Sequence, residues 1–267
     1  MGRSLPPHEL ARLAMVATGR TRAALLVDPP ARGEEQEQLD TLVTRRLAGE
    51  PLQYLEGRIP FGPIELLVDR RALIPRPETE QLLELAVGLL GQAGPGTPLV
   101  DVGTGSGALA LALKHAFPSA PVYGTDLSAD ALALARENAA AGGLDATFLQ
   151  GDLLEPLPAA LRGRVELIVS NPPYVSEAEW AALPDEIRLY EPREALVAGP
   201  EGTEVLSRLA AEAYWWLGVG GWLVCEIGET QGEAVRGLFG AYEREVRADL
   251  TGRPRFVVAR KGAPCCR

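Results

Sequence analysis

Histidine is nearly absent from this sequence of 267 residues, which contains only His8 and His115. A histidine-based catalytic triad or a histidine-rich metal site is therefore not expected, and each histidine is expected on the surface or at a helix end. Cysteine is scarce too: Cys225 lies in an apolar run, and Cys265 and Cys266 are adjacent near the end of the chain, without metal-ligand spacing. These absences predict free thiols and no metal site, as is typical of a cytoplasmic protein.

The sequence also lacks long apolar runs and an excess of basic residues. No run approaches the roughly 20 apolar residues of a membrane span, and no basic stretch followed by an apolar segment opens the chain. We therefore expect a cytoplasmic protein without membrane association. The net charge is −10, and residues 1–80 carry 11 Lys and Arg against 12 Asp and Glu, so the acidic excess lies in the rest of the chain. Such a charge argues against a direct nucleic-acid substrate and favours a basic protein partner or a small substrate.

A polar turn interrupts the apolar run 165–170, which itself predicts a buried strand. The turn consists of Asn171, Pro172, Pro173 and Tyr174. The two prolines fix φ at about −65° and remove backbone N–H groups, which leaves carbonyl oxygens free to accept. The Asn171 side-chain oxygen and the Pro172 carbonyl suit the two hydrogens of a flat NH₂ group, and the Tyr174 ring offers it a face. The turn thus predicts a ligand with an amide or an exocyclic amine.

The first 73 residues predict a small helical domain followed by a hairpin. Apolar residues recur at helical spacing in two stretches, which are Leu10, Leu13, Ala14 and Ala17, then Leu39, Leu42, Val43 and Leu47. A loop containing Pro29, Pro30 and Gly33 separates them, and Gly49 is expected to stop the second helix. Residues 1–57 are therefore predicted to be a helical domain, for which docking of a substrate protein and capping of the fold both fit. Residues 58–73 are predicted to be a β-hairpin linker.

Residues 74–80 form a proline-stiffened segment that leads into a helix beginning near Glu78. Arg76 stands between Pro75 and Pro77, which fixes its backbone and favours a place for its guanidinium in a binding site. We therefore predict that Arg76 contributes to substrate binding.

From residue 74 to residue 267 strand and helix patterns alternate, which is typical of an α/β fold with a mostly parallel sheet. Seven strands are predicted, at residues 99–102, 122–126, 147–152, 165–170, 222–227, 245–250 and 255–259. The last two are joined by a short turn and are expected to form a hairpin at the sheet edge. Because the carboxyl ends of parallel strands share one edge, the polar residues that follow them are expected to line one crevice.

The first of these strands leads into a glycine-rich turn, consisting of Gly103, Thr104, Gly105, Ser106 and Gly107. Glycines there let a ligand approach the backbone, and Asp126 ends the next strand, where an acid can accept from ribose hydroxyls. The turn also satisfies a dinucleotide fingerprint, so a dehydrogenase is one reading. The turn at residues 171–174, whose acceptors would hold an NH₂ group and which we call the amide clamp, has no evident part in hydride transfer, however. An adenosine cofactor beside such an NH₂ acceptor favours methyl transfer.

Taken together, these motifs resemble the class I S-adenosylmethionine-dependent methyltransferases, and within them the peptide chain release factor glutamine N5-methyltransferases. The resemblance covers nearly the whole chain and rests on residues 45–54, 74–80, 101–107, 171–174, 190–193 and 226–228. It implies a Rossmann-like fold, S-adenosyl-L-methionine as cofactor, and class I release factors as protein substrates. It also implies that the glycine turn and Asp126 hold the cofactor, that Asp152 and Leu153 flank its adenine, and that residues 171–174 grip the substrate glutamine.

Three other functions remain open from the sequence. A nucleic-acid adenine methyltransferase can use the same clamp on a flipped base, although no basic recognition region is evident. A dehydrogenase would prefer a nicotinamide dinucleotide to S-adenosylmethionine. A non-catalytic cofactor-binding scaffold is the third, and an intact clamp argues against it.

Overall fold

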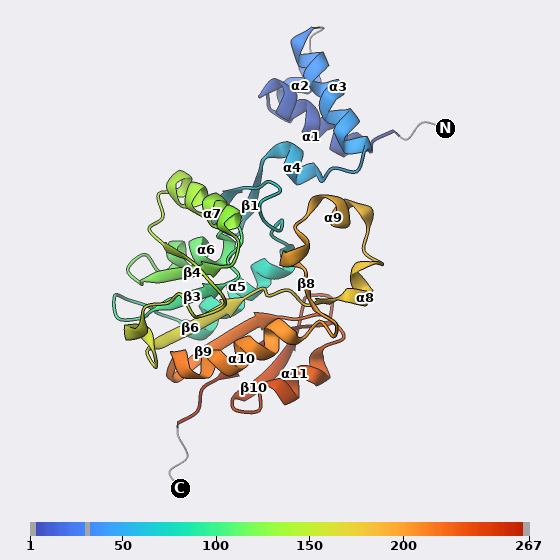
Figure 1. The fold of residues 1–267 in the computed structure, drawn as a ribbon. Helices are drawn as coiled ribbons and strands as arrows, with labels where there is room; N and C mark the ends of the chain where they lie inside the picture. The colour runs from blue at the N-terminus through green and yellow to red at the C-terminus, as the bar shows by residue number, and fades with distance from the viewer. Residues whose placement is uncertain (1–3, 30–32, 264–267) are drawn as a thin grey trace.

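The computed structural model describes residues 4–29 and 33–263, so the predictions for Pro30, Cys265 and Cys266 lie outside the described residues. The chain begins with four helices, α1 (Pro7–Thr18), α2 (Arg22–Val27), α3 (Glu34–Leu47) and α4 (Leu52–Glu56). Figure 1 shows α1, α2 and α3 standing apart from the sheet, with α4 between them and the rest of the chain. They have a core of their own, made of Leu13, Ala14, Ala17, Leu39, Leu42, Leu52 and Leu55.

The structure has one more helix in this region than the two predicted before residue 50. Helix α2 contains no buried residue, so it has no apolar stripe from which its periodicity could be recognised. The second helix predicted in this region, α3, ends at Leu47. Gly49 follows with φ +97°, as expected of a helix-terminating glycine.

The predicted hairpin is present as β1 (Arg58–Phe61) paired antiparallel with β2 (Ile64–Leu67). Phe61, Leu66 and Val68 are buried in the same apolar cluster as the sheet and its helices. The hairpin therefore packs as part of the larger body.

The seven predicted strands form one sheet in the order β10-β11-β9-β6-β3-β4-β5. The five parallel strands are β3 (Leu99–Val102), β4 (Val122–Asp126), β5 (Thr147–Gln150), β6 (Val165–Ser170) and β9 (Leu217–Glu226). At one edge β11 (Pro254–Arg260) runs antiparallel to β9, and β10 (Glu243–Ala248) runs antiparallel to β11. The predicted mostly parallel α/β fold is confirmed.

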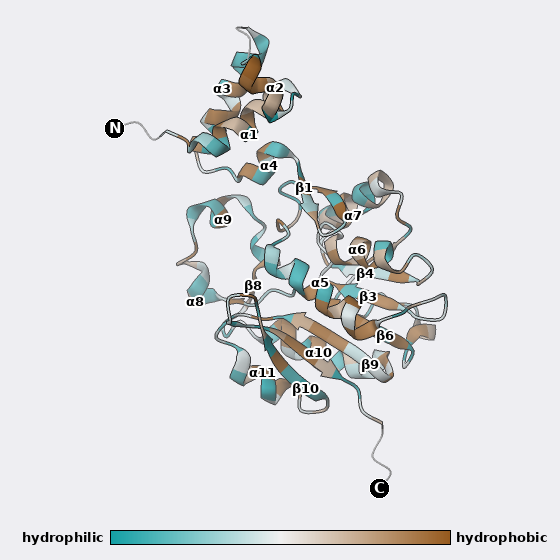
Figure 2. Ribbon diagram, turned by 180° about the vertical axis from the view of Figure 1, so that it is seen from behind, coloured by the Kyte–Doolittle hydropathy of each residue, from teal (hydrophilic) through white to brown (hydrophobic). Residues whose placement is uncertain are grey.

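Helices cover both faces of the sheet. One face carries α5 (Pro77–Leu90), α6 (Ala108–Ala116) and α7 (Ala129–Gly142), and the other carries α10 (Glu204–Trp216) and α11 (Gly232–Leu238). Successive residues of β6 alternate between the two cores, since Leu167 and Val169 pack with the first set and Ile168 with the second. Figure 2 shows apolar residues along the central strands and hydrophilic residues on the edge strand β10.

Strand β9 begins five residues before the predicted start at Trp222, because Gly220 and Gly221 do not interrupt it. Gly220 adopts φ +86°, and a side chain at Gly221 would meet the Val165 carbonyl oxygen at 2.9 Å. The pairing with β6 shifts register here, so the glycines permit an irregularity within one strand.

Between β6 and α10 the chain makes an excursion over the carboxyl ends of the strands. It contains β7 (Val175–Ser176), α8 (Glu177–Trp180), α9 (Asp185–Tyr190) and β8 (Val197–Gly199), and β7 pairs with β8. Sheet order reverses at β3, which has β4 on one side and β6 on the other, and such a switch point is where open α/β sheets bind ligands. Among the described helices, none is long and apolar enough to cross a membrane.

Candidate active site

A cavity of about 430 Å³ lies at the carboxyl ends of the parallel strands. Nine of the predicted site residues line it, namely Gly103, Thr104, Gly105, Asp126, Asp152, Leu153, Asn171, Pro172 and Pro173. Four others, Arg76, Ser106, Gly107 and Tyr174, lie outside its lining. The structure thus brings the glycine turn, the strand-end acids and the proline turn to one place, and it gives the four other residues different positions.

The glycine turn is held by backbone and carboxylate contacts. The N–H groups of Gly103 and Thr104 donate to the Thr125 carbonyl at 2.8 and 2.9 Å. Asp101, at the strand end before the turn, accepts through Oδ2 from the Thr104 hydroxyl at 2.6 Å and from the Ala110 N–H at 3.0 Å. The turn is therefore preformed around a buried acid.

One carboxylate oxygen of Asp101 is left without a hydrogen-bond partner in the described part of the chain. Among the described residues its Oδ1 is buried without a hydrogen-bond partner, and Asp101 lines the cavity. Complete burial raises the pKa of this carboxyl to about 7. A buried acceptor without a partner costs free energy, which a ligand carrying a positive charge or an N–H donor would recover.

Asp126 ends β4, and its carboxylate is fixed by the backbone. Oδ2 accepts from the Gly105 N–H at 2.8 Å, and Oδ1 accepts from the Ser128 N–H at 2.9 Å. Burial raises the pKa of Asp126, while these backbone N–H groups act in the opposite direction. Each carboxylate oxygen has a second lone pair, so Asp126 can also accept from hydroxyl groups of a ligand in the cavity.

We predict that Asp126→Ala weakens cofactor binding. Loss of charge-assisted hydrogen bonds of roughly 1.5 to 3 kcal/mol raises the dissociation constant about tenfold or more. Asp126→Asn keeps one acceptor oxygen and should lose less. Calorimetric titration of both variants with S-adenosylmethionine measures the effect, and an unchanged affinity for Asp126→Ala would refute the assignment.

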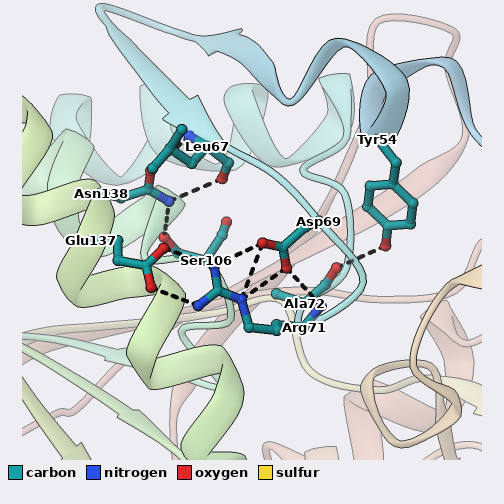
Figure 3. Close-up of polar contacts among 8 residues, drawn as sticks. All are labelled: Tyr54, Leu67, Asp69, Arg71, Ala72, Ser106, Glu137 and Asn138. Atoms are coloured by element: carbon teal, nitrogen blue, oxygen red, sulfur yellow. Dashed lines mark hydrogen bonds and ion pairs between the residues drawn. The ribbon is translucent and has the colours of Figure 1, made fainter.

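Ser106 and Gly107, at the end of the glycine turn, contact α7 rather than the cavity. Gly107 has φ +85°, and a side chain there would meet Ala135 of α7 at 3.2 Å, so this glycine lets two helices approach. The Ser106 carbonyl accepts from Asn138 Nδ2 at 2.9 Å, and the same side chain bonds both backbone groups of Leu67 at 2.6 and 3.1 Å. Figure 3 shows that Asn138 joins the hairpin strand β2, at Leu67, to the glycine turn, at Ser106.

Asp152 and Leu153 follow β5. Asp152 pairs with Arg208 of α10 at 2.6 Å, and both residues line the cavity. Leu153 is the only non-glycine residue with positive φ in the part of the chain described, at +45°. A leucine in this conformation costs of order 1 kcal/mol or more, so its surroundings impose the position at the cavity wall.

The Asn171 carboxamide is oriented by a neighbour on α5. Its Nδ2 donates to the Thr79 hydroxyl at 3.1 Å, which leaves Oδ1, at the other end of the carboxamide, to accept from a ligand. No described backbone N–H donates to the Pro172 carbonyl. Asn171 and Pro172 therefore keep the acceptor character that the sequence predicts. The Tyr174 hydroxyl lies behind them and donates to Glu226 at 3.2 Å, and burial raises the pKa of this tyrosine.

Arg76 does not line the cavity, and its predicted contribution to substrate binding stays a prediction. It forms an ion pair with Glu191, whose side chain is only 2% exposed. Glu191 also accepts from the Ile74 N–H at 3.2 Å. Burial of the Glu191 carboxylate calls for a charged partner, and Arg76 supplies it, so this pair ties the segment before α5 to the loop after α9.

Thr79 and Arg71 are among the lining residues that the sequence analysis did not select. Thr79 contacts Asn171, and Arg71 pairs with Asp69 and with Glu137, at 2.7 Å in each case. Figure 3 shows the Arg71 guanidinium between the two carboxylates. Neither residue ends a strand or belongs to a glycine turn, and strand-end position was the signal on which the predictions relied.

Comparisons with known proteins now decide the family. Residues 85–188 match the model of the methyltransferase small domain, and residues 2–57 match that of the PrmC N-terminal domain. The chain is 48% identical over 221 residues to the release factor glutamine methyltransferase of Deinococcus radiodurans, covering 82% of this chain and 77% of that protein. It is 40% identical over 232 residues to the enzyme of the same name from Enterococcus faecalis, covering 85% and 81%.

The chain belongs to the release factor glutamine methyltransferase family. A methyltransferase from Pyrococcus furiosus shares the fold, with a TM-score of 0.56 at 16% identity over 76% of this chain and 91% of that one. The resemblance found in the sequence is confirmed, and so are the methyltransferase reading and S-adenosylmethionine as the methyl donor. The dehydrogenase and the non-catalytic scaffold fall away as alternatives.

The cavity of this family member fits S-adenosylmethionine. S-adenosylmethionine carries two cationic groups and a ribose, and the cavity offers the unpartnered Asp101 Oδ1 and the fixed carboxylate of Asp126. No group of three or more His, Cys, Asp or Glu among residues 4–29 and 33–263 could hold a metal ion.

Proposed function

We propose that this protein transfers the methyl group of S-adenosylmethionine to the side-chain amide nitrogen of the glutamine in the Gly-Gly-Gln loop of class I peptide chain release factors. The observation that carries the proposal is the Asn171 carboxamide, whose NH₂ group is occupied by Thr79 and whose oxygen is left to accept at the cavity. A pair of acceptors from Asn171 and Pro172 suits a planar NH₂ group. Methyl incorporation from labelled S-adenosylmethionine into a purified release factor tests the proposal. Because release factors work at ribosomes, the proposed setting is the cytoplasm.

The chemistry depends on positioning. An amide nitrogen is a poor nucleophile because its lone pair is delocalised into the carbonyl. Bound S-adenosylmethionine supplies an electrophilic methyl group on its sulfonium. Asn171 Oδ1 and the Pro172 carbonyl each accept one N–H of the substrate amide, which aims its nitrogen and converts a bimolecular encounter into an oriented one.

The same two acceptors also stabilise the positive charge that develops on the substrate nitrogen. As the nitrogen takes up a methyl group it becomes positive, and the fixed oxygens of Asn171 and Pro172 stabilise that charge where it develops. Pro172 is buried and sits between Asn171 and a second proline, so its carbonyl is held rigidly. No general base is needed before transfer, since the amide reacts in its neutral form; after the methyl group has left the sulfonium, the cationic amide releases one N–H proton to solvent and becomes the neutral N-methyl amide. Tyr174, predicted as a catalytic face for the amide, supports the turn from behind through Glu226.

We further propose that the N-terminal helices dock the protein substrate. They have a separate core, and α2 exposes Leu26 and Val27 at 81% and 88%. Part of their contact with the catalytic body is made by the loop around α9, where Arg46 meets Glu186 at 3.2 Å and the Tyr190 hydroxyl donates to the Ala48 carbonyl at 3.3 Å. Adjacent exposed apolar side chains on a helix far from the cavity suit a protein surface better than a small ligand.

Removal of residues 1–47 should leave cofactor binding nearly unchanged, because the cavity lining begins at Arg71. The hairpin must stay, since Phe61 and Leu66 belong to the sheet core. Methylation of intact release factor should show a higher Michaelis constant, because a docking surface contributes binding rather than transition-state stabilisation. Steady-state kinetics measure this, with calorimetric cofactor binding as the check of folding. A truncated, cofactor-binding protein with an unchanged Michaelis constant would rule out the docking role.

A further inference from the structure

A continuous chain of hydrogen bonds lies behind the proline turn. Asn171 Nδ2 donates to Thr79 Oγ1 at 3.1 Å, and the Thr79 hydroxyl donates to Glu226 Oε2 at 2.9 Å. The other Glu226 oxygen accepts from the Tyr174 hydroxyl at 3.2 Å. The residues come from the end of β6, the first turn of α5 and the end of β9, and Thr79 and Glu226 are 4% and 1% exposed. Water has little access to either of them.

The chain has a direction, which the chemistry of its members fixes. A carboxylate can only accept, and a hydroxyl has a single hydrogen to donate. Because Glu226 receives the hydrogen of Thr79, the Thr79 oxygen has only lone pairs left for Asn171. Asn171 must therefore turn its NH₂ group toward Thr79 and its oxygen to the opposite side.

The contacts of Glu226 are those of an ionised carboxylate, which fixes the direction of hydrogen-bond donation from Asn171 through Thr79. Both of its oxygens accept from hydroxyl groups, and Arg255 lies near enough to favour its negative charge. Burial acts against that charge and raises the pKa of Glu226. A buried acid at the end of β9 that does not line the cavity is costly for a fold, and its contacts lead to Asn171.

We propose that Thr79 and Glu226 are positioning residues that set which end of the Asn171 carboxamide faces the substrate, and thereby make the site select an NH₂ group over a carboxylate. The proposal rests on the proposed function of Asn171 as an acceptor. With the carboxamide reversed, Asn171 would present hydrogens to the substrate. An NH₂ group would then be repelled, and a carboxylate would be accepted.

Two variants of Thr79 separate orientation from packing. Thr79→Val keeps the shape and removes the acceptor for Asn171 Nδ2, whereas Thr79→Ser removes a methyl group and keeps the hydroxyl. Loss of one orienting hydrogen bond of about 1 to 1.5 kcal/mol predicts about tenfold lower turnover for Thr79→Val. Thr79→Ser should stay near wild type, and cofactor affinity should be unchanged in both. If packing alone mattered, the serine variant would be the more impaired of the two.

Glu226→Gln offers a second, stronger test. Its amide satisfies every partner in one arrangement, with its oxygen accepting from Tyr174 and its NH₂ donating to Thr79. Thr79 then donates its own hydrogen to the Asn171 oxygen, which reverses the carboxamide. The alternative placement of the amide leaves the Tyr174 hydrogen without an acceptor, which costs free energy in a buried site.

The decisive readout is selectivity. Release factor in which the substrate glutamine is replaced by glutamate is used as an inhibitor, and its inhibition constant is divided by the Michaelis constant of the unchanged release factor. This ratio should fall about tenfold in Thr79→Val and further in Glu226→Gln, and remain at the wild-type value in Thr79→Ser. A merely structural role would lower activity without moving the ratio. Unchanged ratios in Thr79→Val and Glu226→Gln would overturn the inference, and if Glu226→Gln does not fold, the Thr79 pair decides. Failure of the wild-type protein to methylate release factor would instead overturn the proposed function.

Discussion

Asn171→Ala is expected to lower turnover by about 10² or more while cofactor affinity changes little. The substitution removes one of the two acceptors that aim the substrate amide and stabilise its developing charge, and contributions of this kind are of that size. Asn171 also holds Thr79 through Nδ2, but that contact lies on the far side of the amide from the substrate. Single-turnover methylation of release factor measures the chemical step directly.

The control for this variant is its affinity for S-adenosylmethionine, measured by calorimetry. Because the cofactor is expected to depend on Asp101 and Asp126, an intact affinity shows that the fold and the cofactor site survive. Wild-type turnover in Asn171→Ala would overturn the acceptor role of this residue.

Replacing the substrate glutamine of the release factor by glutamate is expected to abolish methylation. A carboxylate has no N–H to donate, and it would face the oxygens of Asn171 and Pro172 as an anion without a partner. The measurement is methyl incorporation into the altered release factor, with the unchanged one as control. Incorporation into the glutamate form at a comparable rate would show that the acceptor pair does not select the substrate.

The fold was largely predictable because its strongest signals are local. Buried parallel strands read as apolar runs, and two of them lead to residues that mark the crevice, Asp126 at the end of β4 and Asn171 directly after β6. The elements that were missed have weak signals. Helix α2 has no buried residue, and strands β7 and β8, which lie between β6 and α10, are only two and three residues long. None of these three elements shows a hydrophobic periodicity that the sequence could reveal.

The site was predictable only where one segment carries the whole signal. The glycine turn and the proline turn each define their own geometry, and both reach the cavity. The partner of a side chain depends on tertiary structure instead. The sequence did not reveal the ion-pair partner of Arg76, because Glu191 is 115 positions away. Thr79 looked like an ordinary residue of a helix start, and its contacts to Asn171 and Glu226 span 92 and 147 positions.

Glu226 is the residue that the sequence could have singled out. It ends a buried parallel strand with an acid, as Asp126 does, but Glu226 is 1% exposed whereas Asp126 is half-buried. The sequence does not tell which way such an acid points. Asp126 opens into the cavity, whereas Glu226 lies behind the proline turn and contacts Thr79 and Tyr174.

The most direct test of the proposed function is a parallel methylation assay. Labelled S-adenosylmethionine is incubated with the protein and, in separate reactions, with a class I release factor, duplex DNA, single-stranded DNA and ribosomal proteins. We predict incorporation into the release factor alone, at the glutamine of its Gly-Gly-Gln loop. Incorporation into DNA but not into the release factor would contradict the proposal and assign the acceptors of Asn171 and Pro172 to a nucleobase amine.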